Sequence, residues 1–182
     1  MLIATYALST LSVEQKKERS FIGRIQNTLH RNAGKLHDID PLRLESDLDQ
    51  LSRFSESRHQ RRVAGCLMPA VRRATDEADA LLADLESLDQ TGSELLRYVR
   101  HSLRPAFAHS TTHDTHGAIQ QLCSSMERYC QNLLQRLAKE EQELLPLARR
   151  VMSGDDWFAV GKAFLASDAR RAERSPGKAL AA

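Results

Sequence analysis

Apolar side chains recur at intervals of three and four residues along a stretch in the C-terminal half of this chain. That spacing places them on one face of a helix. Glu141 falls inside the same stripe, four residues after Leu137 and four before Leu145. A carboxylate buried alone is strongly unfavourable, so we expect Glu141 to be paired, bound to a metal or placed at the edge of a cavity. The apolar positions are Leu122, Met126, Cys130, Leu133, Leu134, Leu137, Leu144, Leu145 and Ala148.

The same pattern occurs earlier in the chain. When Pro69 is aligned with Pro146, residues 66–73 lie over residues 143–150, and the two segments are separated by 77 positions. In this frame His59 lies over Arg136, and Ala64 lies over Glu141. The simplest interpretation is two helical hairpins of related design that face each other in one bundle.

The stretch from Lys139 to Ala148, followed by Asp156-Trp157-Phe158, resembles the bacterial hemerythrin-like family, also called the HHE cation-binding domain. The resemblance implies a four-helix bundle with a non-haem di-iron centre in its core. The ligands of that centre are histidines and two carboxylates. Family members carry or sense dioxygen, sense iron or nitric oxide, or repair iron–sulfur centres, and all these activities need the metal.

The ligand motif of the family is incomplete in this chain. The second and fourth family helices each carry a His-x4-Glu pair shortly before Leu-x-Pro. The second-helix copy here keeps His59 but has Ala64 in place of the Glu, and the fourth-helix copy keeps Glu141 but has Arg136 in place of the His. The resemblance also places Asp76 or Glu77 about where the family carries a third-helix histidine.

We expect an all-α fold, an up-down-up-down four-helix bundle (hemerythrin-like) with an extra short C-terminal helix.

Ser12 and Asp40 are suitable N-cap residues, and Pro41 suits a first helical position. Gly34 falls in an expected loop, and Gly154-Asp155 is expected to start the last helix. The expected segments are an extended N-terminal arm (1–11), a bundle domain (12–174) with helices at about 12–31, 41–66, 71–103, 118–152 and 156–174, and a flexible tail (175–182). Pro69 is expected to kink or divide the chain, Thr91-Gly92-Ser93 to weaken the third helix, and Arg104-Pro105 to end it.

Polar residues interrupt the inward lines of these helices. Glu18 lies four residues before Ile22 on the first helix, so its carboxylate is expected to point at the core. On the second helix, the apolar stripe that ends at Leu51 turns polar. The polar positions there are Ser55, Arg58, His59 and Arg62.

Two physical interpretations explain this polar layer, and in a third interpretation the layer does not exist. In the first, carboxylates and a histidine hold iron, manganese or zinc. In the second, arginines replace the metal and neutralise the carboxylates bidentately. In the third, the helical register is off by one, and Glu140 and Glu141 both face solvent. The metal candidates are Glu18, His59, Glu77 and Glu141; the candidates for core salt bridges are Arg58, Arg62 and Arg136.

Composition and the absence of certain motifs disfavour several classes of function. A formal net charge of +2 is too weak to favour nucleic acid as a partner. No apolar run approaches the roughly 20 residues of a membrane span, and the three cysteines suit reduced thiols in a cytoplasmic protein. The chain carries no phosphate-binding glycine loop, Ser-His-Asp order or CxxC motif, so an enzyme is not favoured. His109, His113 and His116 have a spacing that suits either a divalent-cation site or a polar loop.

Two functional hypotheses follow. The first is a binding protein that senses or stores a metal ion or a diatomic gas at a reduced non-haem site, with one iron ion or none. The second is a metal-free interaction or regulatory module, whose core site is replaced by Arg–carboxylate pairs and whose ligand is a protein partner.

Overall fold

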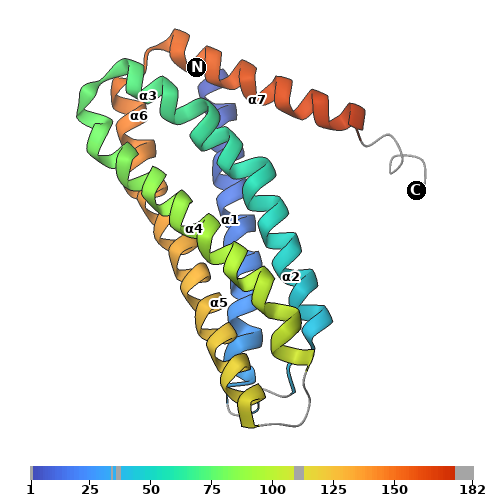
Figure 1. Ribbon diagram of the computed structural model, residues 1–182. Helices are drawn as coiled ribbons and strands as arrows, with labels where there is room; N and C mark the ends of the chain where they lie inside the picture. Colours follow the sequence, from blue (N-terminus) through green and yellow to red (C-terminus); the bar gives the residue numbers. More distant parts are fainter. Residues whose placement is uncertain (1, 34, 36–37, 109–112, 175–182) are drawn as a thin grey trace.

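The computed structural model describes residues 2–33, 35, 38–108 and 113–174, without the side chains of 57–59, 113–115 and 171–174. All regular structure in these ranges is helical (Figure 1), which confirms the expected all-α class. No helix in the described ranges has the length and apolarity needed to cross a membrane.

The first helix, α1 (Leu2–Arg31), corrects the expectation of an extended arm over residues 1–11. Ser12 does not cap this helix but lies exposed in its interior. The helix extends to Leu2 because Ala7 and Leu11 continue its buried face, and both side chains are fully buried.

The second helical run begins as predicted. Asp40 accepts hydrogen bonds from the backbone N–H groups of Leu42 and Arg43, directly before α2 (Pro41–Phe54). The run then continues as helix to Ala74. Its further elements are the π-helical segments η2 (Ser55–Gln60) and η3 (Val63–Leu67), followed by α3 (Met68–Ala74).

The expected helix boundary before Val71 is wrong. Val71 belongs to α3, and the chain leaves the helix at Thr75, whose backbone is extended (φ −165°, ψ 142°). Pro69 does not divide the run: it lies near the start of α3, directly after the wide π-helical turn η3, where the missing backbone N–H and the proline ring are tolerated. After the short 3-10 turn η4 (Asp76–Ala78), α4 runs over Asp79–Ala108.

The ends of α4 and α5 also differ from expectation. Neither Gly92 nor Pro105 interrupts α4; Ala106, beyond the proline, is buried and packs in the core. The fourth helical run begins at His113 rather than near residue 118. It consists of α5 (His113–Lys139), the π-helical segment η5 (Glu140–Leu144) and α6 (Leu145–Val151), and α7 (Gly154–Arg174) follows.

The internal repeat predicted from the sequence is present in the backbone. The π-helical segments η3 and η5 each stand directly before a short α-helix with proline near its start. Shifted by the 77 positions that separate Pro69 from Pro146, the bounds of η3 and α3 coincide with those of η5 and α6. The two segments therefore share a backbone design as well as a sequence pattern, and α3 and α6 contact each other.

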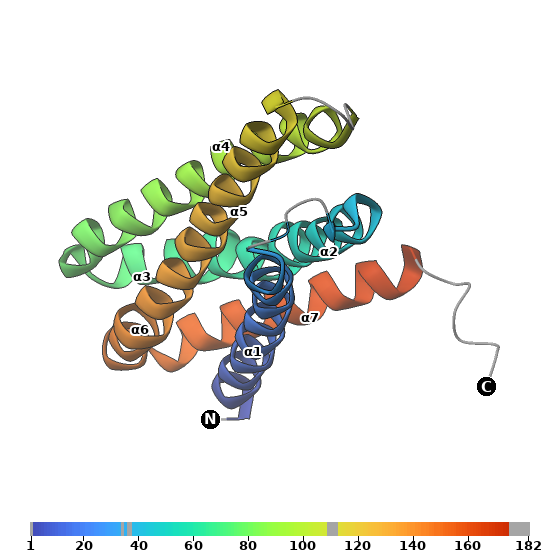
Figure 2. The same ribbon diagram turned by 90° about the horizontal axis from the view of Figure 1, so that it is seen from below.

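The long helices pack lengthwise, and α7 lies across α1 near the N-terminus (Figures 1 and 2). α4 packs against α5, and α1 contacts α2, α5 and α7. Gly161 of α7 comes so close to Ile3 of α1 that a side chain at position 161 would overlap with Ile3 Cγ2. The docking of α7 therefore needs a glycine at this crossing.

The buried apolar residues form two clusters rather than one. On α1, Ala7 and Leu11 belong to one cluster, and Ile22, Ile25 and Leu29 to the other. Between them lie buried polar residues. The same interruption occurs on the second run, on α4 and on the fourth run. Buried polar side chains from these helices include Glu14, Gln15, Glu18, Ser52, Ser55, Arg62, Arg136 and Glu140.

Candidate functional site

The polar layer between the two apolar clusters is the candidate site, and Arg136 is at its centre. Arg136 is 3% exposed. Its Nη2 donates to Glu18 Oε1 at 2.6 Å and to Ser55 Oγ at 3.2 Å, and its Nη1 donates to Asp89 Oδ1 at 3.1 Å. Its Nε lies 3.5 Å from Glu140 Oε1. One guanidinium thus connects α1, η2, α4 and η5.

The electrostatics of this cluster favour the charged guanidinium. Burial lowers the pKa of Arg136, but Glu18, Glu140 and Asp89 outweigh that effect and hold its pKa above the ordinary value. Buried charge-assisted hydrogen bonds of this kind are among the stronger polar contacts in proteins. Because each carboxylate comes from a different element, the cluster fixes how those elements pack.

A second buried arginine ties α7 to the rest of the fold. Arg62 donates to Glu14 Oε1 at 2.6 Å and also to Asp168 of α7. Tyr6 of α1 donates its hydroxyl to the other Asp168 oxygen at 3.0 Å. The guanidinium lies 5.0 Å from the ring centroid of Phe164, a cation–π contact.

The structure brings together only part of the residue set predicted from the sequence. Glu18, Arg62 and Arg136 lie in the polar layer. Glu77 lies in η4, before α4 begins; its side chain is 58% exposed and pairs with Arg150 at 2.6 Å. The expectation that Glu77 lies on the inward face of a third helix is therefore wrong.

The predicted register around Glu141 is also wrong. Its side chain is 57% exposed and accepts a hydrogen bond from Arg19 at 2.9 Å. The neighbouring Glu140 is 2% exposed and takes the inward position instead. Glu140 continues the buried line of this run, because it lies three residues after Leu137 and four before Leu144.

Several predicted residues lie outside the described part of the structure. The side chains of Arg58, His59 and His113 are among these, as is the whole of His109. His116 is exposed on α5. Among the residues described, no group of three or more His, Cys, Asp or Glu side chains is arranged to hold a metal ion. Glu18, Asp89 and Glu140 contact Arg136 instead, and Glu14 contacts Arg62.

Sequence reasoning missed Asp89, although a signal for it exists. The inward line of α4 runs through Leu82, Leu85, Asp89, Gly92, Leu96 and Val99, at spacings of three and four. The sequence therefore indicates that the Asp89 carboxylate lies on an inward line of otherwise non-polar residues. Glu140 had a signal of the same kind, because it lies three residues after Leu137 and four before Leu144.

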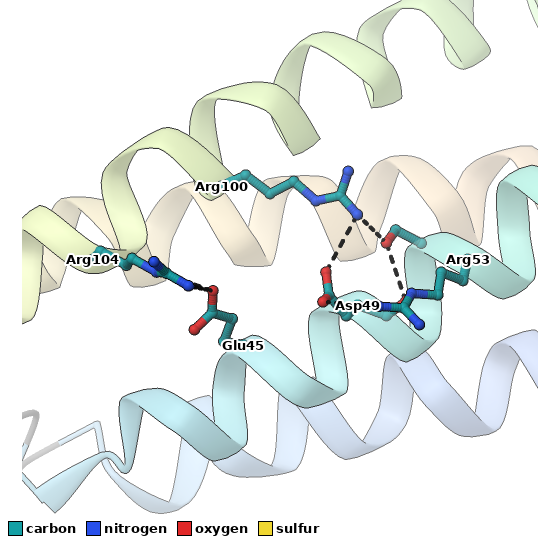
Figure 3. Close-up of polar contacts among 6 residues, drawn as sticks. Glu45, Asp49, Arg53, Arg100 and Arg104 are labelled. Carbon is teal, nitrogen blue, oxygen red and sulfur yellow. Dashed lines mark hydrogen bonds and ion pairs between the residues drawn. The ribbon is translucent and has the colours of Figure 1, made fainter.

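The outer face of the bundle has its own ion pairs (Figure 3). Arg104 of α4 pairs with Glu45 of α2 at 3.0 Å. Arg100 lies 3.4 Å from Asp49 and donates to Ser52 Oγ at 2.6 Å. Exposed pairs of this kind contribute little individually, so they supplement the buried cluster rather than replace it.

The cysteines do not add a reactive site. Cys66, Cys123 and Cys130 are all free thiols, and Cys130 is buried. Burial, with a smaller contribution from Glu127, raises the pKa of Cys130 to about 12. The thiol of Cys130 is therefore protonated at neutral pH and acts as an apolar core residue.

Comparisons with protein-family models, with curated protein sequences and with solved structures find no match for this chain. The likeness to hemerythrin-like proteins therefore rests on the sequence motif around residues 139–148.

The titration of Asp89 gives a testable pH dependence. Burial raises its pKa above the ordinary 3.8, and Arg136 opposes this only in part. The folded protein thus binds this proton more tightly than the unfolded chain, and the resulting stability is lost as pH rises through the folded pKa. The Asp89→Asn variant has no carboxyl group at this position, so it does not lose this stability as pH rises. Urea unfolding at several pH values from about 4 to about 7 should show the variant gaining stability relative to wild type as pH rises. A constant or falling difference would contradict this account.

Proposed function

We propose that this protein is a hemerythrin-like, up-down-up-down four-helix bundle with a C-terminal helix, and that it serves in the cytoplasm as an interaction or regulatory module without a transition-metal centre. The observation that carries the proposal is the contact of Arg136 with Glu18, Asp89 and Glu140 at 2.6, 3.1 and 3.5 Å.

The positive charge of Arg136 disfavours a metal ion in the polar layer. A guanidinium carries a permanent positive charge and presents several donors in a rigid plane. Arg136 stands at the position where the family motif has a histidine ligand, and it occupies carboxylate oxygens that would otherwise be available to a cation. A dication placed beside it would meet a like charge at short range. The cluster supplies internally the charge neutralisation that a metal supplies in the family.

The surface of α7 supports an interaction role. Its inner face buries Trp157, Val160 and Phe164 against the bundle. Phe158 and Leu165 lie seven residues apart, and thus on a common face; they are 55% and 50% exposed. These two exposed apolar side chains give α7 a contact for a protein partner outside the face that packs on its own bundle.

Metal content separates this proposal from the first hypothesis. Untagged protein would be purified from cells grown with iron, manganese and zinc, and measured by elemental mass spectrometry. We expect no stoichiometric metal, because Arg136 occupies carboxylate oxygens of Glu18 and Asp89 and its positive charge repels a dication. A stoichiometric metal would support instead a residual non-haem site that senses or stores metal or a diatomic gas. His59→Ala should then remove that metal.

The interaction role is tested by site-specific photo-crosslinking in the producing cell. A photoreactive phenylalanine analogue would replace Phe158 on α7 or, as the matched control, Tyr98 on α4, which is also a partly exposed aromatic residue at 42%. We expect a discrete crosslinked species of higher mass only for position 158. The same pattern at both positions would contradict a partner surface on α7.

A further inference from the structure

A small polar pocket lies beside Arg136, between η2, α4 and α5. Its volume is about 20 Å³, enough for a single water-sized group. Polar side chains on its walls include Ser55, Asp89, Tyr129 and Asn132. Glu56 and Ser93, which are exposed, also line it, so the pocket is a polar recess that reaches the surface of the molecule.

Asn132 provides an acceptor without a donor in this pocket. The residue is 8% exposed, and its Oδ1 has no hydrogen-bond partner among the described residues. Gly92, on the facing wall, leaves room for that oxygen, since a Cβ at position 92 would lie 2.7 Å from it. A buried acceptor of this kind is costly unless a donor reaches it. The pocket therefore favours a ligand that donates hydrogen bonds.

The charges beside the pocket specify the ligand further. The Asp89 carboxylate lines the pocket and is 17% exposed, and Glu56 lies at the same pocket with an exposed side chain. The Nη atoms of Arg136 already donate to other residues. The pocket thus offers the Asn132 carbonyl oxygen and the carboxylates of Asp89 and Glu56 to a group that carries positive charge and donates hydrogen bonds.

We propose that this pocket binds a small monovalent cation of ammonium size, held by the Asn132 carbonyl oxygen and the Asp89 carboxylate. A single positive charge suits the site better than a dication, because Arg136 is close and repels the higher charge more strongly. Neither a protein partner nor a transition metal is needed, so this binding goes beyond the function proposed above.

The probe is ammonium chloride, compared with tetramethylammonium chloride at equal ionic strength, because the tetramethylammonium ion is too large for the pocket and donates no N–H bond. Thermal unfolding of the full chain is followed as ammonium replaces tetramethylammonium. A ligand that binds only the folded state raises the Tm with concentration. We expect a Tm increase of a few degrees with ammonium. The same Tm in both salts would mean that the pocket holds only water, and it would overturn the proposal.

Variants locate the effect. Asn132→Leu and Asp89→Asn should each abolish the ammonium-dependent rise in Tm, whereas Asn27→Leu, at an exposed position on α1, should retain it. Asp89→Asn keeps the shape of the side chain, so it remains informative if Asn132→Leu does not fold. An ammonium-dependent rise that persists in Asp89→Asn would place the binding elsewhere and overturn the proposal.

Discussion

The buried guanidinium of Arg136 is the contact on which the rest of this fold depends. Four separate elements contribute groups to it, and three of those groups are carboxylates. Without the guanidinium, Glu18 would be a fully buried carboxylate with no described donor. Buried ion pairs contribute less to net stability than to fixing one arrangement, since their desolvation is costly. Here the arrangement fixed is the register at which the two apolar clusters meet.

A related arrangement joins α7 to the bundle. Arg62 connects Glu14 of α1 with Asp168 of α7, and the close crossing of Ile3 and Gly161 joins the same two helices. The inner apolar face of α7 belongs to the core cluster that also contains Ala7 and Leu11 of α1. The two buried arginines thus have different roles: Arg136 organises the middle of the bundle, and Arg62 secures its C-terminal helix. In the proposed function, the first makes a metal unnecessary and the second presents the outer face of α7.

Much of this organisation is encoded in local pattern. The spacing of apolar residues predicted the helices, and the Pro69–Pro146 alignment predicted a repeat that extends to the backbone turns. Cap chemistry at Asp40 predicted one helix start correctly. Spacing alone could not decide which carboxylate enters the core beside Arg136. Glu141 lies four residues after Leu137 and Glu140 lies three after it, so both fit an apolar stripe, and only the packed structure shows that Glu140 is the buried one. The N-terminal part of α1, before residue 12, was missed for another reason: Ala7 and Leu11 pack against α7, far away in sequence.

The most direct test of this account is a double-mutant cycle between Arg136 and Glu18, measured as the free energy of unfolding in urea. The account predicts that Arg136→Met and Glu18→Gln each cost roughly 3–5 kcal/mol, because each leaves a buried group without its partner. The double variant should lose clearly less than the sum, since Glu18→Gln also removes one of the charges that Arg136→Met leaves unpaired. Arg72→Met, which breaks an exposed pair with Glu86, should unfold like wild type. Small, additive losses at positions 136 and 18 would contradict the central role of this contact.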